Sequence, residues 1–511
     1  MTLVKYSFKY IFLHVIKTCI LNLHQLILFI VVFLFYATTA KAQSEKGWTT
    51  EFRGIGTHSS PRAVDLNNDG IKDLIIGCGK KEFQQSDTGI IAVNGKSGKI
   101  LWKVEARDQI YGSAAICDIN RDGTPDIIIG GRAAELKAIN GKNGKVIWAF
   151  FPKVNSMEPR KKGWFNFYNP QVIPDQNNDG IEDILVSNGG DILVPAYNSN
   201  RPTGNILVID GSNGKILAQA KVPDGKETYL SLVISKLSKE DDDYAIIFGT
   251  GGETIGGNLY RTSLKDIMRG DISSATSLYN SKDKGFIAPP VLCDLNLDGC
   301  LDIVDNAVEG TTVAIDGKTN KIIWKKTIAN TEVYGSLAAG YFNNDSIPDL
   351  FTTFTKGVWP NLNDSKQIMY NGKTGEIEFI DSLGILQTSS PVVADFNNDG
   401  YDDGLVNINF KVTEKEFFHV FHNFLAVYDF HRQSTYQLSS ELAGINLSST
   451  PWIGDLDGDG KLDIVYCYLT NTRSETAMDG FKMVRLSLDV EIKKPIRWGA
   501  YMGSSYDGIL K

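Results

Sequence analysis

Short apolar runs alternate with polar, glycine-containing turns along most of the chain. The first full example has Asp65, Asn67 and Asp69 at alternate positions. A glycine and Asp73 follow, and the apolar run Leu74–Gly77 comes directly afterwards. A run of β-branched residues bounded by glycine is typical of a strand. The pattern therefore predicts a polar loop that joins two strands.

This loop recurs in register at a spacing of roughly 50 residues, which indicates a repeat architecture. Further intact copies begin at Asp118, Asp175, Asp294, Asp395 and Asp455. A seventh copy has Tyr341 at its first position and Ser346 in place of the glycine. An eighth, over residues 229–249, keeps the two apolar runs but has a charged stretch instead of the loop.

A second motif lies in most intervals between these loops. Asn-Gly or Asp-Gly turns between apolar runs occur at 94–98, 140–144, 210–214, 316–320 and 371–375. Such turns are strong hairpin signals. Each repeat thus predicts four antiparallel strands. The whole chain is therefore expected to have an all-β fold, a β-propeller with eight four-stranded blades, or with seven if the eighth copy is not a blade.

Trp102, Trp148 and Trp324 recur at one position after these hairpin turns, and we expect them to dock between neighbouring blades. A propeller ring is closed by a strand from one terminus that completes a blade begun at the other. The segment at Gly47–Arg53 and the segment at Ile496–Tyr501 both resemble the outer strand of a repeat. The sequence does not choose between them.

The polar loops have the chemistry of a calcium site. Ca²⁺ takes about 6–8 oxygen ligands, and side chains at alternate positions of a turning loop converge on one point. An EF-hand needs a glutamate at its twelfth position and a helix afterwards, whereas here Ile76 holds that position within a predicted strand. We therefore predict about six calcium sites between strands.

The predicted calcium ligands belong to the six intact loops. They are Asp65, Asn67, Asp69, Asp73; Asp118, Asn120, Asp122, Asp126; Asp175, Asn177, Asp179, Asp183; Asp294, Asn296, Asp298, Asp302; Asp395, Asn397, Asp399, Asp403; and Asp455, Asp457, Asp459, Asp463.

These loops and hairpins resemble the integrin α-chain type repeats known as FG-GAP or VCBS repeats, and the tryptophan positions are similar to those of quinoprotein-like propellers. The resemblance covers residues 48–500 and implies a calcium-binding propeller. It implies little about activity, because propellers host many functions.

The N-terminal 42 residues contain no Asp or Glu, and the apolar run Leu26–Tyr36 precedes Ala40-Lys-Ala42. This pattern predicts a secretory signal peptide over residues 1–42, with an uncleaved anchor as the alternative. Residues 43–511 then form a single propeller domain that is secreted, periplasmic or at the cell surface. No second apolar run of spanning length follows.

The net charge of −8 comes largely from the Asp-rich loops and argues against nucleic acid as a partner. The cysteines that follow the predicted signal peptide are odd in number and scattered over predicted strands, which does not indicate a disulfide framework. Cys293 and Cys300 flank one loop, and whether they pair is left open.

Most long insertions fall in connections on the face opposite the polar loops, including residues 151–169, 188–203 and 250–258. Binding residues favour loops held on a rigid scaffold, so we expect a ligand surface on this face. The basic aromatic segment supplies its candidates: Arg160, Lys161, Lys162 and Trp164.

The sequence has no nucleophile elbow, phosphate loop or dinucleotide fingerprint in a structural context that would suit catalysis. It therefore favours a non-catalytic, calcium-binding module for adhesion or for binding an extracellular or envelope protein or glycan. Two alternatives stay open. One is a secreted carbohydrate-active enzyme similar to polysaccharide lyases, and the other is an envelope assembly scaffold.

Overall fold

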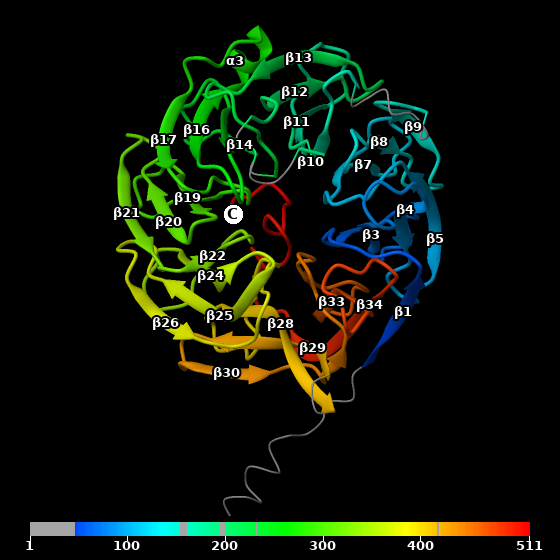
Figure 1. Cartoon of the computed structure of the whole chain (residues 1–511), viewed down its shortest axis with the longest axis vertical. Coiled ribbons are helices and arrows are strands. Elements are labelled where there is room, and N and C mark those ends of the chain that lie inside the picture. The colour runs from blue at the N-terminus through cyan, green and yellow to red at the C-terminus, as the bar shows by residue number, and fades with distance from the viewer. Residues whose placement is uncertain are drawn as a thin grey trace, which may run out of the picture. The chain divides into compact units, whose positions relative to one another are not determined.

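Eight antiparallel sheets follow one another around a central axis in the computed structural model (Figure 1). The structure describes residues 46–153, 161–191, 193–194, 198, 200–230, 232–415 and 418–511. Gly47–Lys511 form one unit. The protein is an eight-bladed β-propeller, as the repeats predict, and the predicted signal peptide lies outside the described residues.

Blades 1 to 4 are each built from four consecutive strands. They are β2 (Arg62–Val64), β3 (Asp73–Gly77), β4 (Ser86–Val93), β5 (Ile100–Ala106); β6 (Ala115–Cys117), β7 (Asp126–Gly130), β8 (Leu136–Ile139), β9 (Val146–Ala149); β10 (Asn166–Ile173), β11 (Asp183–Gly189), β12 (Asn205–Ile209), β13 (Ile216–Lys221); and β14 (Val233–Ser235), β15 (Ala245–Gly249), β16 (Gly257–Ser263), β17 (Thr276–Ser281). Helix α3 (Leu264–Arg269) lies between β16 and β17.

Blades 5 to 8 follow the same plan with small additions. They are β18 (Val291–Cys293), β19 (Asp302–Ala307), β20 (Thr311–Ile315), β21 (Ile322–Thr327); β22 (Thr331–Glu332), β23 (Ala338–Gly340), β24 (Asp349–Val358), β25 (Asn361–Tyr370), β26 (Ile377–Asp381); β27 (Val392–Ala394), β28 (Asp403–Lys415), β29 (Phe418–Asp429), β30 (Ser434–Gln437), β31 (Leu442–Ala443); and β32 (Trp452–Gly454), β33 (Lys461–Leu469), β34 (Gly480–Glu491), β1 (Lys46–Arg53).

Antiparallel pairing places the connections alternately on two faces of the propeller. The Asp-rich loops and the hairpin turns lie on one face, called here the Asp-loop face. The connections between the second and third strands of a blade, and those between blades, lie on the other, called here the insertion face. The copy of the repeat at residues 229–249, which lacks the Asp-rich loop, is a true blade. It is blade 4, and β14 and β15 form its first two strands. Its loop is capped by Asp241, which accepts hydrogen bonds from the backbone N–H groups of Leu237 and Ser238.

The N-terminal strand closes the ring. β1 pairs with β34 as the outer strand of blade 8, and the indole Nε1 of Trp48 donates a hydrogen bond to the carbonyl oxygen of Gly95 in blade 1, at 2.8 Å. The other predicted candidate, at Ile496–Tyr501, turns inward instead. The two ends therefore have different roles that their similar sequences do not reveal.

The three predicted docking tryptophans repeat this contact. Trp102, Trp148 and Trp324 are buried, and each Nε1 donates to a glycine carbonyl oxygen in the hairpin turn of the next blade. The acceptors are Gly141, Gly211 and Gly372, at 2.7, 2.7 and 2.6 Å. Each tryptophan thus combines apolar burial with a satisfied indole donor, which fixes the spacing of two blades.

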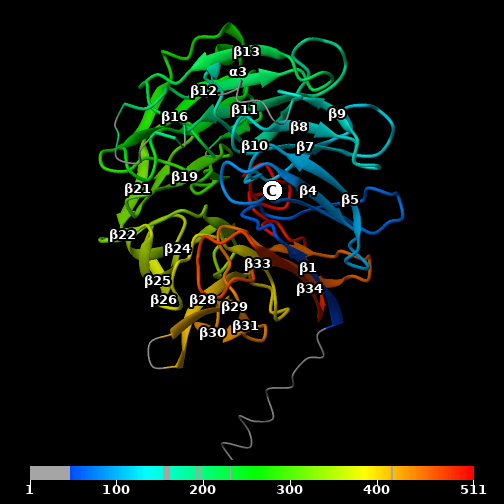
Figure 2. The same ribbon diagram turned by 45° about the vertical axis from the view of Figure 1, so that its right-hand side comes forward.

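The C-terminal segment fills the centre of the ring, as both views show in red (Figures 1 and 2). Backbone N–H groups of three innermost strands donate to its carbonyl oxygens. Val393 donates to Trp498 at 2.8 Å, Ile453 to Gly499 at 2.6 Å, and Leu292 to Gly508 at 2.8 Å. The segment therefore joins blades 5, 7 and 8 from the inside.

A second inner link is a chain of hydrogen bonds near the start of successive blades. In each step a backbone N–H donates to the side-chain oxygen of the equivalent residue in the next blade, at 2.9–3.3 Å. The participants, from blade 6 through blade 8 to blade 3, are Ser336, Ser390, Thr450, Ser60, Ser113 and Asn169.

Arg62 is 1% exposed and lies where blade 1 meets the C-terminal segment. Its guanidinium donates to the carbonyl oxygens of Ala114 and Tyr501, and its Cζ lies 4.1 Å from the ring centroid of Tyr506. No carboxylate forms an ion pair with it among the described residues, and burial lowers its pKa to about 10. The carbonyl oxygens and the aromatic ring therefore stabilise this charge.

All five cysteines in the described part of the chain are buried free thiols. Cys293 and Cys300, whose pairing the sequence leaves open, form no disulfide. Cys293 packs in the apolar core beside blade 6, whereas Cys300 packs in the core beside blade 4. The cysteines act here as small apolar side chains.

We predict that Tyr506→Ala lowers the free energy of unfolding by about 3 kcal/mol, because it removes a packed aromatic ring and leaves the Arg62 charge without it. Tyr506→Phe should cost about 1 kcal/mol, since only the hydroxyl hydrogen bonds with Ala63 and Trp452 are lost. Urea denaturation measures both. Tyr436→Ala, at a side chain 40% exposed on the outer strand β30, is the control, and an equal loss there would contradict the role of the central segment.

Candidate functional site

The six intact Asp-rich loops share one backbone geometry. In each, the first Asp accepts a hydrogen bond from the backbone N–H of the turn glycine five residues later, at 2.6–3.0 Å. The glycine has a φ between 77° and 96° in all six, a left-handed conformation that glycine adopts at little cost. The first Asp and the glycine therefore fix the curl of the loop.

The last predicted ligand of each loop, an Asp at its ninth position, has a role that the sequence did not indicate. It is fully buried in every intact loop. In four of these loops, and in the seventh copy, one of its oxygens accepts a hydrogen bond from the backbone N–H of a hairpin glycine in the same blade. The pairs are Asp73–Gly95, Asp126–Gly141, Asp183–Gly211, Asp302–Gly317 and Asp349–Gly372, at 3.0–3.2 Å. This carboxylate thus ties the two repeated motifs together.

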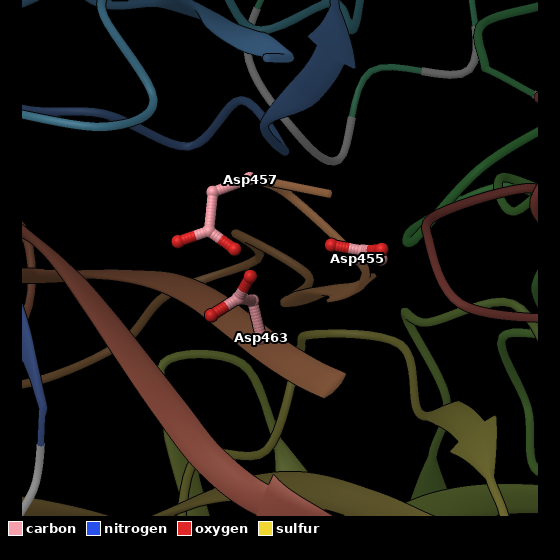
Figure 3. Close-up of side chains that lie close together, drawn as sticks. All are labelled: Asp455, Asp457 and Asp463. Atoms are coloured by element: carbon pink, nitrogen blue, oxygen red, sulfur yellow. The ribbon is translucent and has the colours of Figure 1, made fainter. Parts of the chain in front are cut away.

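In blade 8, three of the predicted ligands lie close together (Figure 3). Carboxylate oxygens of Asp455, Asp457 and Asp463 all lie within 4.8 Å of one another. Arg485 supplies one positive charge, with its Nη2 2.6 Å from Asp457 and 2.9 Å from Asp463. The Oδ1 of Asp457 is buried and has no hydrogen-bond partner among the described residues. An unpaired buried oxygen among three carboxylates fits a hard cation such as Ca²⁺.

The seventh loop differs in the features that the others share. Tyr341 cannot supply the first carboxylate, and neither Asn344 nor Ser346 has the left-handed backbone of the equivalent residues in the intact loops. Asp345 still accepts a hydrogen bond from the N–H of Ile347, at 2.9 Å. The loop therefore keeps the turn and loses most of the ligand geometry.

Burial raises the pKa of two of the ninth-position carboxyls, Asp349 and Asp403, to about 8. For Asp403, the nearby carboxylates of Asp429, Asp399 and Asp395 add to the effect of burial in raising the pKa. One oxygen of Asp349 and one of Asp403 have no hydrogen-bond partner within the described residues. Such a carboxyl is held neutral near pH 7 unless a cation lies beside it.

The predicted basic segment on the insertion face is only partly exposed. Arg160 lies outside the described residues. Lys161 and Lys162 are exposed, whereas Trp164 packs against Phe150 and Phe167, with ring centroids 5.4 and 6.4 Å apart. Trp164 thus belongs to the aromatic packing between blades 2 and 3, and replacing it is expected to cost stability.

A cavity of about 300 Å³ opens on the insertion face beside the central axis. We call it the insertion-face cavity. Connections of blades 1 to 5 line it, and three of the predicted insertions contribute, with Tyr168, Arg201 and Glu253 among their residues. Tyr168 precedes Asn169, whose side-chain Nδ2 donates to the hydroxyl of Tyr501 at 3.1 Å. The cavity therefore lies next to the C-terminal segment that fills the centre of the ring.

Two ion pairs set the electrostatics of the insertion-face cavity, one with a half-exposed carboxylate and one that is nearly buried. The Nη1 of Arg132 lies 2.8 Å from Glu82, and the Nη1 of Arg201 lies 2.9 Å from Glu227. Both guanidinium groups are nearly buried, with side chains 11% and 10% exposed. Each arginine in the lining is thus already matched by a carboxylate.

Tyrosine rings supply the remaining wall. Tyr111 stacks on His58, with ring centroids 4.5 Å apart, and meets Tyr168 edge to face at 6.2 Å. Tyr229 lies beside Gly190, where an added Cβ would approach its ring to 1.9 Å. Burial raises the pKa of Tyr111 to about 12, so its hydroxyl stays protonated at neutral pH.

Sequence reasoning found the face of this cavity but missed most of its residues. Tyr111, Arg132 and Arg201 lie in three different connections, Glu227 and Tyr229 lie in a fourth, and no local motif joins them. A weak signal existed, because an aromatic residue stands one or two positions before the Ser or Asn of the inner hydrogen-bond chain in Tyr111-Gly-Ser113 and Tyr168-Asn169.

The model of the FAM234A/B beta-propeller family matches residues 62–284. This span corresponds to blades 1 to 4 and is less than half of the chain. No curated protein sequence gives a significant match. The similarity to integrin-type repeats stays a prediction.

Several solved structures share the architecture at low sequence identity. A europium-containing methanol dehydrogenase is 11% identical, with 88% of this chain and 94% of that chain covered and a TM-score of 0.57. A quinohemoprotein alcohol dehydrogenase from Comamonas testosteroni is 11% identical, with 88% and 77% covered and a TM-score of 0.53. Sqt1 from Saccharomyces cerevisiae is 8% identical, with 88% and 100% covered and a TM-score of 0.51. At these identities the likeness concerns the fold alone.

In the part of the chain that the structure describes, none of the helices is long and apolar enough to cross a membrane.

His58 stacks on Tyr111 behind the wall of the insertion-face cavity and tests how far this region excludes water. Burial lowers its pKa to about 4, whereas an unfolded chain takes up this proton at about pH 6.5. The unfolded state therefore binds more protons between these values, and the free energy of unfolding should fall by about 3 kcal/mol as the pH is lowered from about 6.5 to about 4. His58→Gln should lack this part of the pH dependence in urea denaturation. Parallel curves for the two proteins would contradict the burial of His58.

Proposed function

We propose that this protein is a calcium-stabilised β-propeller binding module, exported by its N-terminal segment, that takes an extracellular or envelope protein or glycan at the insertion-face cavity. The observation that carries the proposal is the cavity itself, which combines two nearly buried, ion-paired arginines with three tyrosines on a rigid ring. Small-molecule sites are concave and largely pre-formed, with a few placed polar groups. No catalytic step is part of this proposal.

Calcium would be held on the opposite face, by the first, third, fifth and ninth positions of the Asp-rich loops. The donor chemistry of the blade 8 loop supports this, because Asp455, Asp457 and Asp463 converge and one buried oxygen lacks a partner within the described residues. A bound Ca²⁺ would neutralise these carboxylates and pin the first two strands of a blade together. The metal would act on stability, while the ligand binds elsewhere.

A polysaccharide lyase needs a base that removes a proton beside the uronate carboxylate. Tyr111 and Tyr168 lie near Arg132 and are the candidates in the insertion-face cavity. Burial raises the pKa of both hydroxyls above their ordinary value, which weakens them as bases at neutral pH. This consideration favours binding over catalysis.

The calcium proposal predicts that chelation lowers the melting temperature. Extracellular calcium modules have dissociation constants of about 10⁻⁴–10⁻³ M, so each site would add about 1 kcal/mol at roughly 1 mM calcium. Magnesium should substitute poorly, because it demands a tighter octahedral geometry. Thermal unfolding with calcium, with magnesium and with chelator measures this effect, and identical curves would overturn the proposal.

Asp459 and Asp345 form a matched pair for testing whether the stabilisation by calcium arises at the intact loops. Each accepts a hydrogen bond from the backbone N–H two residues later, at 2.8 and 2.9 Å, but only Asp459 lies in an intact loop. With chelator, Asp459→Ala and Asp345→Ala should lower the melting temperature alike. With calcium, Asp459→Ala should cost about 1 kcal/mol more, since it also weakens one site. Equal losses in both conditions would assign these residues to the turns alone.

The binding proposal predicts that filling the cavity abolishes ligand capture. Thr254 lines the cavity and is half-buried, so Thr254→Trp should fill the space while leaving both ion pairs in place. Lys161→Ala combined with Lys162→Ala is the control on the same face, outside the lining. Capture is measured on glycan arrays and by pull-down of envelope proteins. Loss of capture in the lysine variant alone would move the ligand to the basic segment.

A further inference from the structure

We propose that the ligand of the insertion-face cavity is a neutral saccharide unit of a glycan, recognised through its hydroxyl groups. This inference rests on the proposed function, because it names the ligand class of the same site. It begins from the charge balance of the lining and from its tyrosines, which are independent features of the cavity.

The charge balance argues against an anionic ligand. Arg132 and Arg201 are the arginines among the described residues of the lining, and each already lies within 2.9 Å of a carboxylate, from Glu82 and Glu227. Just outside the lining, the ammonium group of Lys284 forms an ion pair with Glu332. A uronate or phosphate would have to compete with these carboxylates for the same cations, and Glu253 in the lining would repel it.

A paired arginine and carboxylate suit a hydroxyl group. A guanidinium has five N–H donors and a carboxylate has about four lone-pair sites, so one ion pair uses only part of the hydrogen-bonding capacity of these two kinds of group. A hydroxyl is both donor and acceptor, so neighbouring hydroxyls of a sugar can bridge the two partners without disturbing their charge. Arg201 and Glu227 present such a pair, 2.9 Å apart, at the wall of the cavity.

Tyr111, Tyr168 and Tyr229 supply the complementary apolar surface. Their rings are amphipathic, with apolar carbon edges and a hydroxyl whose pKa burial raises, so that it stays protonated. A sugar ring likewise combines apolar and polar parts, since its C–H groups are apolar and its hydroxyls are polar. A volume of about 300 Å³ lies at the lower end of the range for small-molecule sites, which fits one or two sugar units rather than a peptide.

The position of the Tyr229 ring is fixed by its neighbours, and this makes the cavity selective for a ligand of matching shape. Its ring has Gly190 at one edge, where an added Cβ would lie 1.9 Å from it, and Gly252 at the other, where the distance would be 3.2 Å. The hydroxyl of Tyr229 hydrogen-bonds to Glu227. Ring, carboxylate and guanidinium are therefore held as one pre-organised group, which lowers the cost of ordering on binding.

Glu227→Gln tests the inference directly, on a glycan array that carries neutral and uronate-containing oligosaccharides of equal length. The isosteric amide keeps the packing and removes the charge that matches Arg201. We expect the wild-type protein to capture neutral glycans, and Glu227→Gln to gain at least tenfold in uronate binding. Glu135→Gln is the matched control, because Glu135 is a buried carboxylate paired with Lys137 outside the lining. It should leave selectivity unchanged.

The remaining outcomes separate this inference from the function on which it rests. Capture of uronate glycans alone by the wild-type protein would overturn the neutral ligand class and leave the binding function standing. Capture of an envelope protein that Thr254→Trp abolishes, without capture of any glycan, would do the same. A Glu227→Gln protein that gains no uronate binding would overturn the argument from charge balance. Absence of any ligand would overturn both proposals.

Discussion

Every blade of this ring depends on its neighbours to cover its two sheet faces. Strands such as β3, β7 and β15 are buried along their whole length, so a blade left without a neighbour would expose a continuous apolar surface. The ring therefore has to close, and β1 closes it by completing the sheet of β34. The docking tryptophans, the inner hydrogen-bond chain and the central segment all reinforce contacts that this closure makes possible.

The blades could be predicted because their signals are local. An Asp-rich loop, a glycine turn and a hairpin turn each lie within a few residues, and their repetition fixed the strand order and the blade count. Even the blade whose loop lacks the Asp-rich motif altogether was predicted, since Tyr244–Gly249 retains the apolar run of a second strand. The buried role of Asp73 and its equivalents was missed, because the partner glycine lies in a different motif of the same repeat.

Features built from distant segments could not be predicted in this way. Trp48 and Trp498 stand in similar surroundings in the sequence, yet one docks on blade 1 and the other pairs with Val393. The insertion-face cavity draws its residues from several different connections, so only its face was predicted. Arg62 shows the same limit, since its partners Ala114 and Tyr501 lie far away in the chain and carry no opposite charge.

The pairing of β1 with β34 has a consequence for biosynthesis. Seven blades consist of strands that follow one another, so each can form soon after it leaves the ribosome. Blade 8 cannot, because its outer strand is made first and its other strands are made last. Until the two ends meet, β1 and β34 each present an unpaired edge that could accept a strand from another chain. The first of the described strands to be translated is thus the last to find its place.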